Sequence, residues 1–269
     1  ARLRPRRAAV PSLIETFHYP KTGPGLMYDR MREQIEARGG AVHLRSAVVR
    51  VERTGFVVNR VVAADPDGVE TAWEADEVLS SIPITGLVEM LSPTAPEAVI
   101  HASRQLTFRN LLSVNLIVDH PDLFPDNWIY VHAPELRVGR IQNFKNWSPA
   151  MVPDRSKTSL GMEYFASNGD DLWTLDDDAL VALGTEELRR TGLLRGARVI
   201  GGSVARAPKA YPVYKRGYQA HLDVVVDYLS GFENLQAMGR YGMFKYNNAE
   251  HSILTAILKL TKLKAFGLC

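Results

Sequence analysis

A strand, a glycine turn and the start of a helix follow one another near the end of this chain. Residues 234–238 predict a short strand, Gly239 and Arg240 come directly after it, and Asn247 with Glu250 three residues later is a helix-capping pair. Four apolar residues then predict the buried stripe of that helix: Ile253, Leu254, Ile257 and Leu258. Because the first amides of a helix have no partners inside it, such a junction can receive an anionic or electron-rich ligand. The alternative is that Gly239 only permits the turn and Arg240 is a solvated charge.

Two further segments have a defined layout. Tyr19, Pro20 and Gly23 precede an expected helix at 27–37, and a Gly-Gly pair then leads into an expected strand at 41–52. Residues 75–83 predict a second strand, which ends in a proline. Each of these patterns is common in proteins that mix helices and strands, so none of them specifies a function by itself.

Together, the three segments resemble the FAD-dependent superfamily of amine oxidases, protoporphyrinogen oxidases and UDP-galactopyranose mutases. The C-terminal segment is similar to the motif with which those enzymes contact the flavin: a Gly-Arg pair, nearby tyrosines and a helix start, with Asn248 where the mutases tend to have an aspartate. The resemblance implies an FAD cofactor that approaches Gly239 closely and lies near the charge of Arg240. The cofactor-binding residues it implies are Val48, whose backbone would pair with adenine, and Gly239, Arg240, Asn247, Asn248 and Ala249.

One feature of that superfamily is missing from the sequence. Its members begin with a βαβ unit whose Gly-x-Gly-x-x-Gly motif places the pyrophosphate on a helix N-terminus. No such motif occurs in this chain: Gly23-Pro24-Gly25 lacks the third glycine, and Gly201-Gly202 is a simple doublet. We therefore expect the C-terminal part of such an enzyme, without the N-terminal dinucleotide-binding unit.

The expected fold class is α+β, with an incomplete FAD-binding domain and a substrate domain. The cofactor domain would comprise 17–83 and 234–258, the substrate domain 84–233, and the flanking segments 1–16 and 259–269. Strands expected at 56–63, 69–73 and 76–81 would form a small antiparallel group. Strands near 111–118, 128–131, 139–143, 158–165 and 198–207 would form a mixed or antiparallel sheet covered by helices, which we expect near 85–91, 96–105, 176–191 and 218–230.

A cationic and aromatic segment follows the last of those strands. Arg206, Lys209 and Tyr211 lie on a proline-stiffened strand exit that could line a pocket for an anionic or aromatic substrate, and Tyr246 could join them. The alternative is a surface strand end with solvated cations. No catalytic acid, base or nucleophile is identified, because the seven histidines are dispersed and no serine-hydrolase elbow occurs. The spacing of the histidines predicts no metal site.

Composition and net charge limit the kinds of partner and the cellular location that we expect. The formal net charge of +2 gives no reason to expect nucleic-acid binding, and no run approaches the roughly 18 apolar residues that span a bilayer. The single cysteine, Cys269, cannot form a disulfide within the chain, which fits a reducing compartment, so we expect a cytoplasmic protein. The expected partner is a small-molecule substrate, and the oligomeric state stays open.

The function that follows from the resemblance is hydride transfer from an organic substrate to FAD, in the complete protein. The chain alone, without its dinucleotide-binding unit, is expected to be inactive. A flavin-dependent sugar-nucleotide mutase is one alternative, because it has the same fold and cofactor. A binding module that has lost the dinucleotide-binding unit and catalyses nothing is another, and it predicts that no flavin binds.

Overall fold

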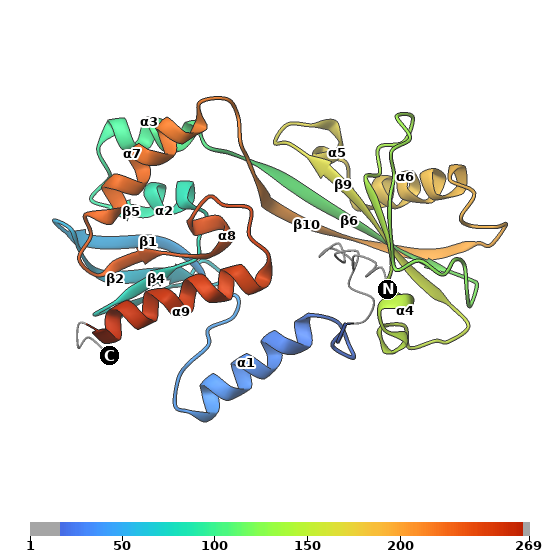
Figure 1. The fold of residues 1–269 in the computed structure, drawn as a ribbon, viewed down its shortest axis with the longest axis horizontal. Coiled ribbons are helices and arrows are strands. Elements are labelled where there is room, and N and C mark those ends of the chain that lie inside the picture. Colours follow the sequence, from blue (N-terminus) through green and yellow to red (C-terminus); the bar gives the residue numbers. More distant parts are fainter. Residues whose placement is uncertain (1–16, 266–269) are drawn as a thin grey trace, which may run out of the picture.

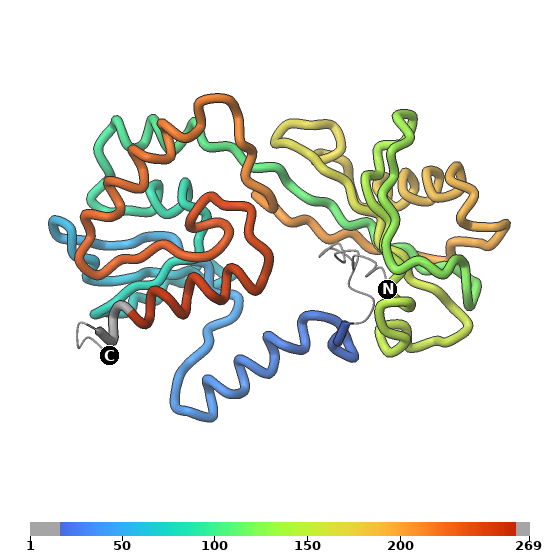
Figure 2. Tube along the Cα trace, viewed as in Figure 1, coloured from blue at the N-terminus to red at the C-terminus, as the bar shows by residue number. Residues whose placement is uncertain are grey.

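The computed structural model describes residues 17–265 of the 269-residue chain. The expected flanking segment 1–16, the end of the flanking segment 259–269 and Cys269 lie outside the described residues. The described residues form two hydrophobic cores joined by two long strands (Figure 1). The chain crosses from the first core to the second along one of these strands and returns along the other (Figure 2).

A four-stranded sheet underlies the first core, with the strand order β3-β2-β1-β5. Its strands are β1 (Ala47–Thr54), β2 (Val57–Ala64), β3 (Glu70–Glu74) and β5 (Leu91–Ser92). Three helices cover it: α2 (Ile84–Met90), α3 (Glu97–Gln105) and α7 (Tyr218–Ser230). Val51 and Val58 of the sheet are almost fully buried beside Leu87, Val99 and Val225 of the helices.

These three helices pack in the first core, although the sequence placed them apart from its strands. Residues 84–105 and 218–230 were assigned to the substrate domain, yet their apolar faces pack in the first core. The reason is that α3 and α7 lie against each other and complete the cover of the same sheet. Only the residues between them, from β6 to most of β10, belong to the second core.

The second core lies in a five-stranded antiparallel sheet of order β10-β6-β9-β8-β7. Its strands are β6 (Thr107–Val118), β7 (Trp128–Tyr130), β8 (Arg140–Asn143), β9 (Thr158–Ala166) and β10 (Val199–Val213). Alternate residues of β6, from Leu112 to Val118, are fully buried and pack with α6 (Asp177–Arg190). The Asp176 side chain caps α6 by accepting a hydrogen bond from the Ala179 amide at 2.7 Å. The expected α+β class, with a helix-covered sheet, is confirmed.

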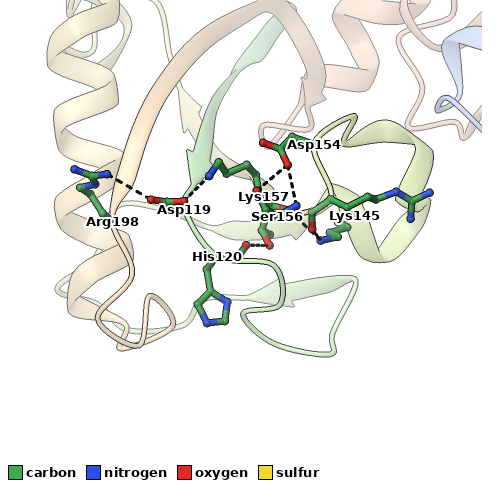
Figure 3. Close-up of polar contacts among 9 residues, drawn as sticks. Asp119, His120, Lys145, Asp154, Ser156, Lys157 and Arg198 are labelled. Carbon is green, nitrogen blue, oxygen red and sulfur yellow. Dashed lines mark hydrogen bonds and ion pairs between the residues drawn. The ribbon is translucent and has the colours of Figure 1, made fainter.

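Short elements flank this sheet at its two ends. α4 (Phe144–Trp147) and a 3₁₀ turn at Pro149–Met151 lie at the end far from the first core, whereas α5 (Asp171–Thr174) follows the end of β9, beside the start of β6. The Lys145 ammonium donates to three backbone carbonyls of the surrounding loops, and Asp119 pairs with both Lys157 and Arg198 (Figure 3). These contacts hold the end of β6, the start of β9 and the start of β10 together.

The third sheet is a pair of short parallel strands, β4 (Val78–Ser80) and β11 (Leu235–Ala237). The sequence placed residues 76–81 in an antiparallel group with β2 and β3, and this is wrong. The cause is the buried side chain of Asn234, whose amide bonds to both backbone groups of Val58 and to the carbonyl of Asp76. These bonds turn the chain away from β3 and leave β4 to pair with β11.

Two helices, α9 (Ala249–Ala265) and α1 (Gly25–Ala37), have unpartnered apolar faces. The stripe of α9 was expected to be buried, but Ile253, Leu254, Ile257 and Leu258 are 38–57% exposed. None of the residues of α1 is buried, and the helix stands away from both cores. The pattern correctly predicted the helices, but no described element covers the apolar side of either one.

Candidate functional site

A pocket of about 540 Å³ opens where β11 ends and the short helix α8 (Gly239–Gly242) leads to α9. Five of the six residues predicted to bind a cofactor line it: Gly239, Arg240, Asn247, Asn248 and Ala249. Tyr28 of α1 and Ser81, just after β4, complete the opposite wall. The sixth residue, Val48, lies on β1 against the first core and does not line this pocket.

Glycine is needed at both ends of α8. Gly239 has φ +72°, a left-handed conformation that costs other residues energy. A Cβ placed on Gly239 would lie 3.9 Å from Ser252 and 4.0 Å from Ser81, both of which line the pocket, so the missing side chain leaves space inside it. A Cβ on Gly242 would lie 2.9 Å from a backbone carbonyl of β4, so α8 can approach that strand closely only with glycine there.

The start of α9 lies at the pocket, one residue later than the predicted cap. The helix begins at Ala249, which puts Asn248 rather than Asn247 in the capping position. The Asn248 carbonyl accepts the Ser252 amide at 3.1 Å, and the Asn248 side chain donates to Glu250. The helix-start amide of Glu250 and the Asn248 side chain lower the pKa of the Glu250 carboxyl. Negative charge is therefore stabilised at this helix end.

Arg240 joins the pocket to the last part of β10. Its Nε donates to the carbonyl of Ala210 at 3.1 Å, and one terminal nitrogen donates to the carbonyl of Asn247 at 2.9 Å. The guanidinium carbon lies 4.6 Å from the ring centre of Tyr211 and 4.4 Å from that of Tyr246. Asn247 is thus held by its backbone against Arg240, which explains why this buried residue is not the helix cap.

Of the four predicted substrate residues, the structure brings two together. The rings of Tyr211 and Tyr246 stack at 5.9 Å beside Arg240. Arg206 lies on the opposite face of β10, where it pairs with Asp177 and donates to the carbonyl of Leu175 at 2.7 Å. It contacts the covering helices rather than the tyrosines, so we omit it from the site.

Lys209 is also separated from the two tyrosines. The pairing of β10 with β6 is irregular between residues 207 and 211, and Lys209 there has φ +55°. Its side chain lines a different pocket, between α2, α3 and β6.

The sequence did not identify a buried ion pair beside Tyr211. Arg140 of β8 pairs with Glu163 of β9, their side chains are 14% and 8% exposed, and Arg140 donates to the Tyr211 hydroxyl at 2.8 Å. Burial opposes the charge of Arg140, but the Tyr211 hydrogen bond and the charge of Glu163 outweigh it and raise the pKa of the guanidinium. Glu163 could have been found from the sequence, because it is the single carboxylate in a mostly apolar nine-residue strand. No feature of the sequence marks Arg140 as its partner.

Among residues 17–265, no group of three or more histidine, cysteine or acidic side chains is placed to hold a metal ion. Within the same residues, no helix combines the length and the hydropathy that crossing a bilayer requires.

Comparison with known proteins gives a family for residues 8–200 and a fold for most of the chain. A family model described as flavin containing amine oxidoreductase matches residues 8–200. A reduced UDP-galactopyranose mutase is 17% identical, with a TM-score of 0.73, and the match covers 93% of this chain and 52% of that one. No curated protein sequence matches the chain.

Two further solved structures have the same fold. A protein assigned as a protoporphyrinogen oxidase from Exiguobacterium sp. 255-15 is 18% identical with a TM-score of 0.68, covering 91% of this chain and 51% of that one. An oxidoreductase from Methanosarcina mazei is 15% identical with a TM-score of 0.64, covering 90% and 55%. The chain therefore spans about half the length of the solved structures that it matches.

Proposed function

The chain belongs to the family of flavin containing amine oxidoreductases, and from this premise we propose that it forms part of an FAD-dependent oxidoreductase whose flavin nucleotide contacts the pocket at α8 and α9. One observation carries the proposal. Five residues chosen from the sequence motif line a single pocket at the N-terminus of a 17-residue helix.

The chemistry of the pocket fits part of a flavin nucleotide. Gly239 leaves space where a side chain would stand, so a planar or phosphate group can approach the backbone there. The start of α9 favours negative charge, and Arg240 adds a positive charge beside it. A pocket of about 540 Å³ surrounds only a part of a dinucleotide, so we expect further contacts to come from outside this pocket.

In this proposal the residues of the chain bind and orient, while the cofactor provides the redox step. A flavin held by Gly239, Arg240 and the start of α9 would supply hydride-transfer chemistry. The amides around Asn248 and Ala249 would stabilise the negative charge of the reduced ring. Tyr211 and Tyr246, which Arg240 holds in place, offer aromatic surface for a substrate next to the cofactor.

The test compares two glycine substitutions in an FAD titration. Gly239→Ala and Gly55→Ala both put an alanine at a positive φ, +72° and +60°, and neither creates a close contact. Only Gly239 lines the pocket, whereas Gly55 lies in the turn between β1 and β2. FAD binding is followed by the change in flavin fluorescence, and the thermal stability of both variants is recorded without ligand.

We expect FAD to bind the unmodified chain weakly and Gly239→Ala to weaken it at least about tenfold, or 1.4 kcal/mol. Gly55→Ala should leave the affinity unchanged while lowering stability to a similar extent. If FAD does not bind, or if both variants bind it equally well, the pocket is not the flavin site. The first of these results would favour the binding module without catalysis.

A further inference from the structure

A second pocket, of about 500 Å³, lies at the junction of the two cores. One wall is formed by Thr85 and Glu89 of α2 and by the end of α3. The opposite wall comes from the start of β6, the loop after β9 and the irregular part of β10. A molecule bound there would contact elements of both cores.

Positive charge dominates this junction pocket. Four cationic side chains and a single carboxylate line it: Arg104, Arg109, Lys209, Lys215 and Glu89. Between residues 17 and 265, none of the four cations has a carboxylate within 4.0 Å. Elsewhere in the described residues, Arg50, Arg137, Arg189 and Arg206 are each paired with a carboxylate. Four like charges around one cavity repel one another unless an anion neutralises them.

The backbone of the pocket is arranged to direct Lys209 into it. Asn110 is 2% exposed, accepts the Lys209 amide at 2.9 Å and donates to the side chain of Asn168 at 2.8 Å. These bonds hold Lys209 at φ +55°. Residues other than glycine adopt this backbone conformation at a cost in energy, and it persists only where the surrounding contacts impose it. The Lys209 ammonium then lies 3.3 Å from the Thr85 hydroxyl.

One lining group lacks a hydrogen-bond partner. The hydroxyl oxygen of Thr107 is buried, and within the described residues no donor or acceptor contacts it. A buried polar atom without a partner costs free energy. In this pocket a bound oxyanion would supply the missing acceptor, with cations on either side.

We propose that the junction pocket binds a small, multiply charged oxyanion of the phosphate type. Arginine and lysine side chains are the groups that proteins use to bind phosphate oxygens, and four of them surround this cavity. The site is separate from the proposed flavin pocket and shares no lining residue with it. It goes beyond the proposed function, since it needs no flavin to operate.

The test uses inorganic pyrophosphate as the probe and isothermal titration calorimetry as the measurement, with sodium chloride adjusted to keep the ionic strength constant. The variants are Arg104→Gln and Lys209→Gln, with Lys209→Arg as the conservative change. Arg190→Gln is the matched control, because Arg190 is an exposed cation of α6 outside the pocket. Gly239→Ala shows whether pyrophosphate binds instead in the proposed flavin pocket, which Gly239 lines. Thermal unfolding without ligand checks that each variant is folded.

We expect one saturable site per chain and a dissociation constant raised about tenfold or more by each glutamine variant in the pocket. Lys209→Arg, Arg190→Gln and Gly239→Ala should bind pyrophosphate as the unmodified chain does. The proposal is overturned if binding is not saturable at constant ionic strength, or if Arg104→Gln and Lys209→Gln bind normally. It is equally overturned if only Gly239→Ala loses binding, because the pyrophosphate then occupies the flavin pocket.

Discussion

Replacing Arg240 by methionine should destabilise the folded chain strongly, because this side chain links the pocket at α8 and α9 to β10. The substitution keeps a long apolar side chain and removes the guanidinium. It deletes the hydrogen bonds to Ala210 and Asn247 and the contacts with the rings of Tyr211 and Tyr246.

The expected size follows from those contacts. Hydrogen bonds from a charged donor contribute about 1.5–3 kcal/mol each, so two of them give about 3–6 kcal/mol. Each cation–π contact adds roughly 0.5–1 kcal/mol where the cation is partly solvated. Arg240 is half-buried, so water can reach the two carbonyls after truncation, and contributions of neighbouring contacts do not add fully. We therefore expect a loss of about 3 kcal/mol for Arg240→Met.

Urea unfolding followed by tryptophan fluorescence measures this loss. Arg240→Lys retains the charge but cannot reach both carbonyls, and it should lose about half as much. Arg216→Met is the control, because Arg216 is exposed, and it should change stability by less than about 0.5 kcal/mol. A loss below about 1 kcal/mol for Arg240→Met, or equal losses for the methionine variants of Arg240 and Arg216, would refute the linking role of Arg240.

Three further predictions concern other parts of the structure. Glu163→Gln leaves the buried charge of Arg140 without a partner and should cost about 3–5 kcal/mol in urea unfolding, whereas adding Arg140→Met should recover part of it; no recovery would contradict a buried ion pair. Gly242→Ala places a Cβ 2.9 Å from a carbonyl of β4 and should lower stability by about 1–3 kcal/mol in thermal unfolding, so unchanged stability would show that α8 can shift freely. The hydrogen bond from Lys157 lowers the pKa of Asp119, so this carboxylate stabilises the fold above its unfolded pKa of about 3.9, and that contribution disappears as the pH falls through the folded value. Asp119→Asn should therefore be less stable than the parent chain at neutral pH and equal to it in strong acid, and a constant difference across the pH range would contradict this assignment.

Local sequence signals predicted most helices and strands. The expected helix at 176–191 is α6 at Asp177–Arg190, because its cap and its apolar face are both set by neighbouring residues. Strand β10 was expected to end at 207, since prolines follow at 208 and 212, but it continues to Val213. β10 is an edge strand, and proline is tolerated there because its missing N–H need not pair with a neighbour.

Local sequence patterns could not predict which distant segments contact each other. The partner of β4 depends on Asn234, more than 150 residues away along the chain. The apolar stripe of α9 has helical spacing whether or not another element covers it, so spacing could not predict that Ile257 is 53% exposed. In the site, the motif around Gly239 gathered in one pocket because its residues are close in sequence. Arg206 and Lys209 separated from Tyr211 because a strand alternates its faces and this one is irregular.

The long pair of β6 and β10 has a consequence for how the chain folds. One end of β6 carries Phe108, which packs on the first core, and the other end carries Leu116 and Val118 of the second. Its pairing with β10 runs without a linker from one core to the other. These strands are far apart in the sequence, and such non-local pairing slows folding because a large loop must close before the contacts form. Neither core can then be complete before β6 and β10 pair. We therefore expect the two cores to unfold together in one cooperative transition.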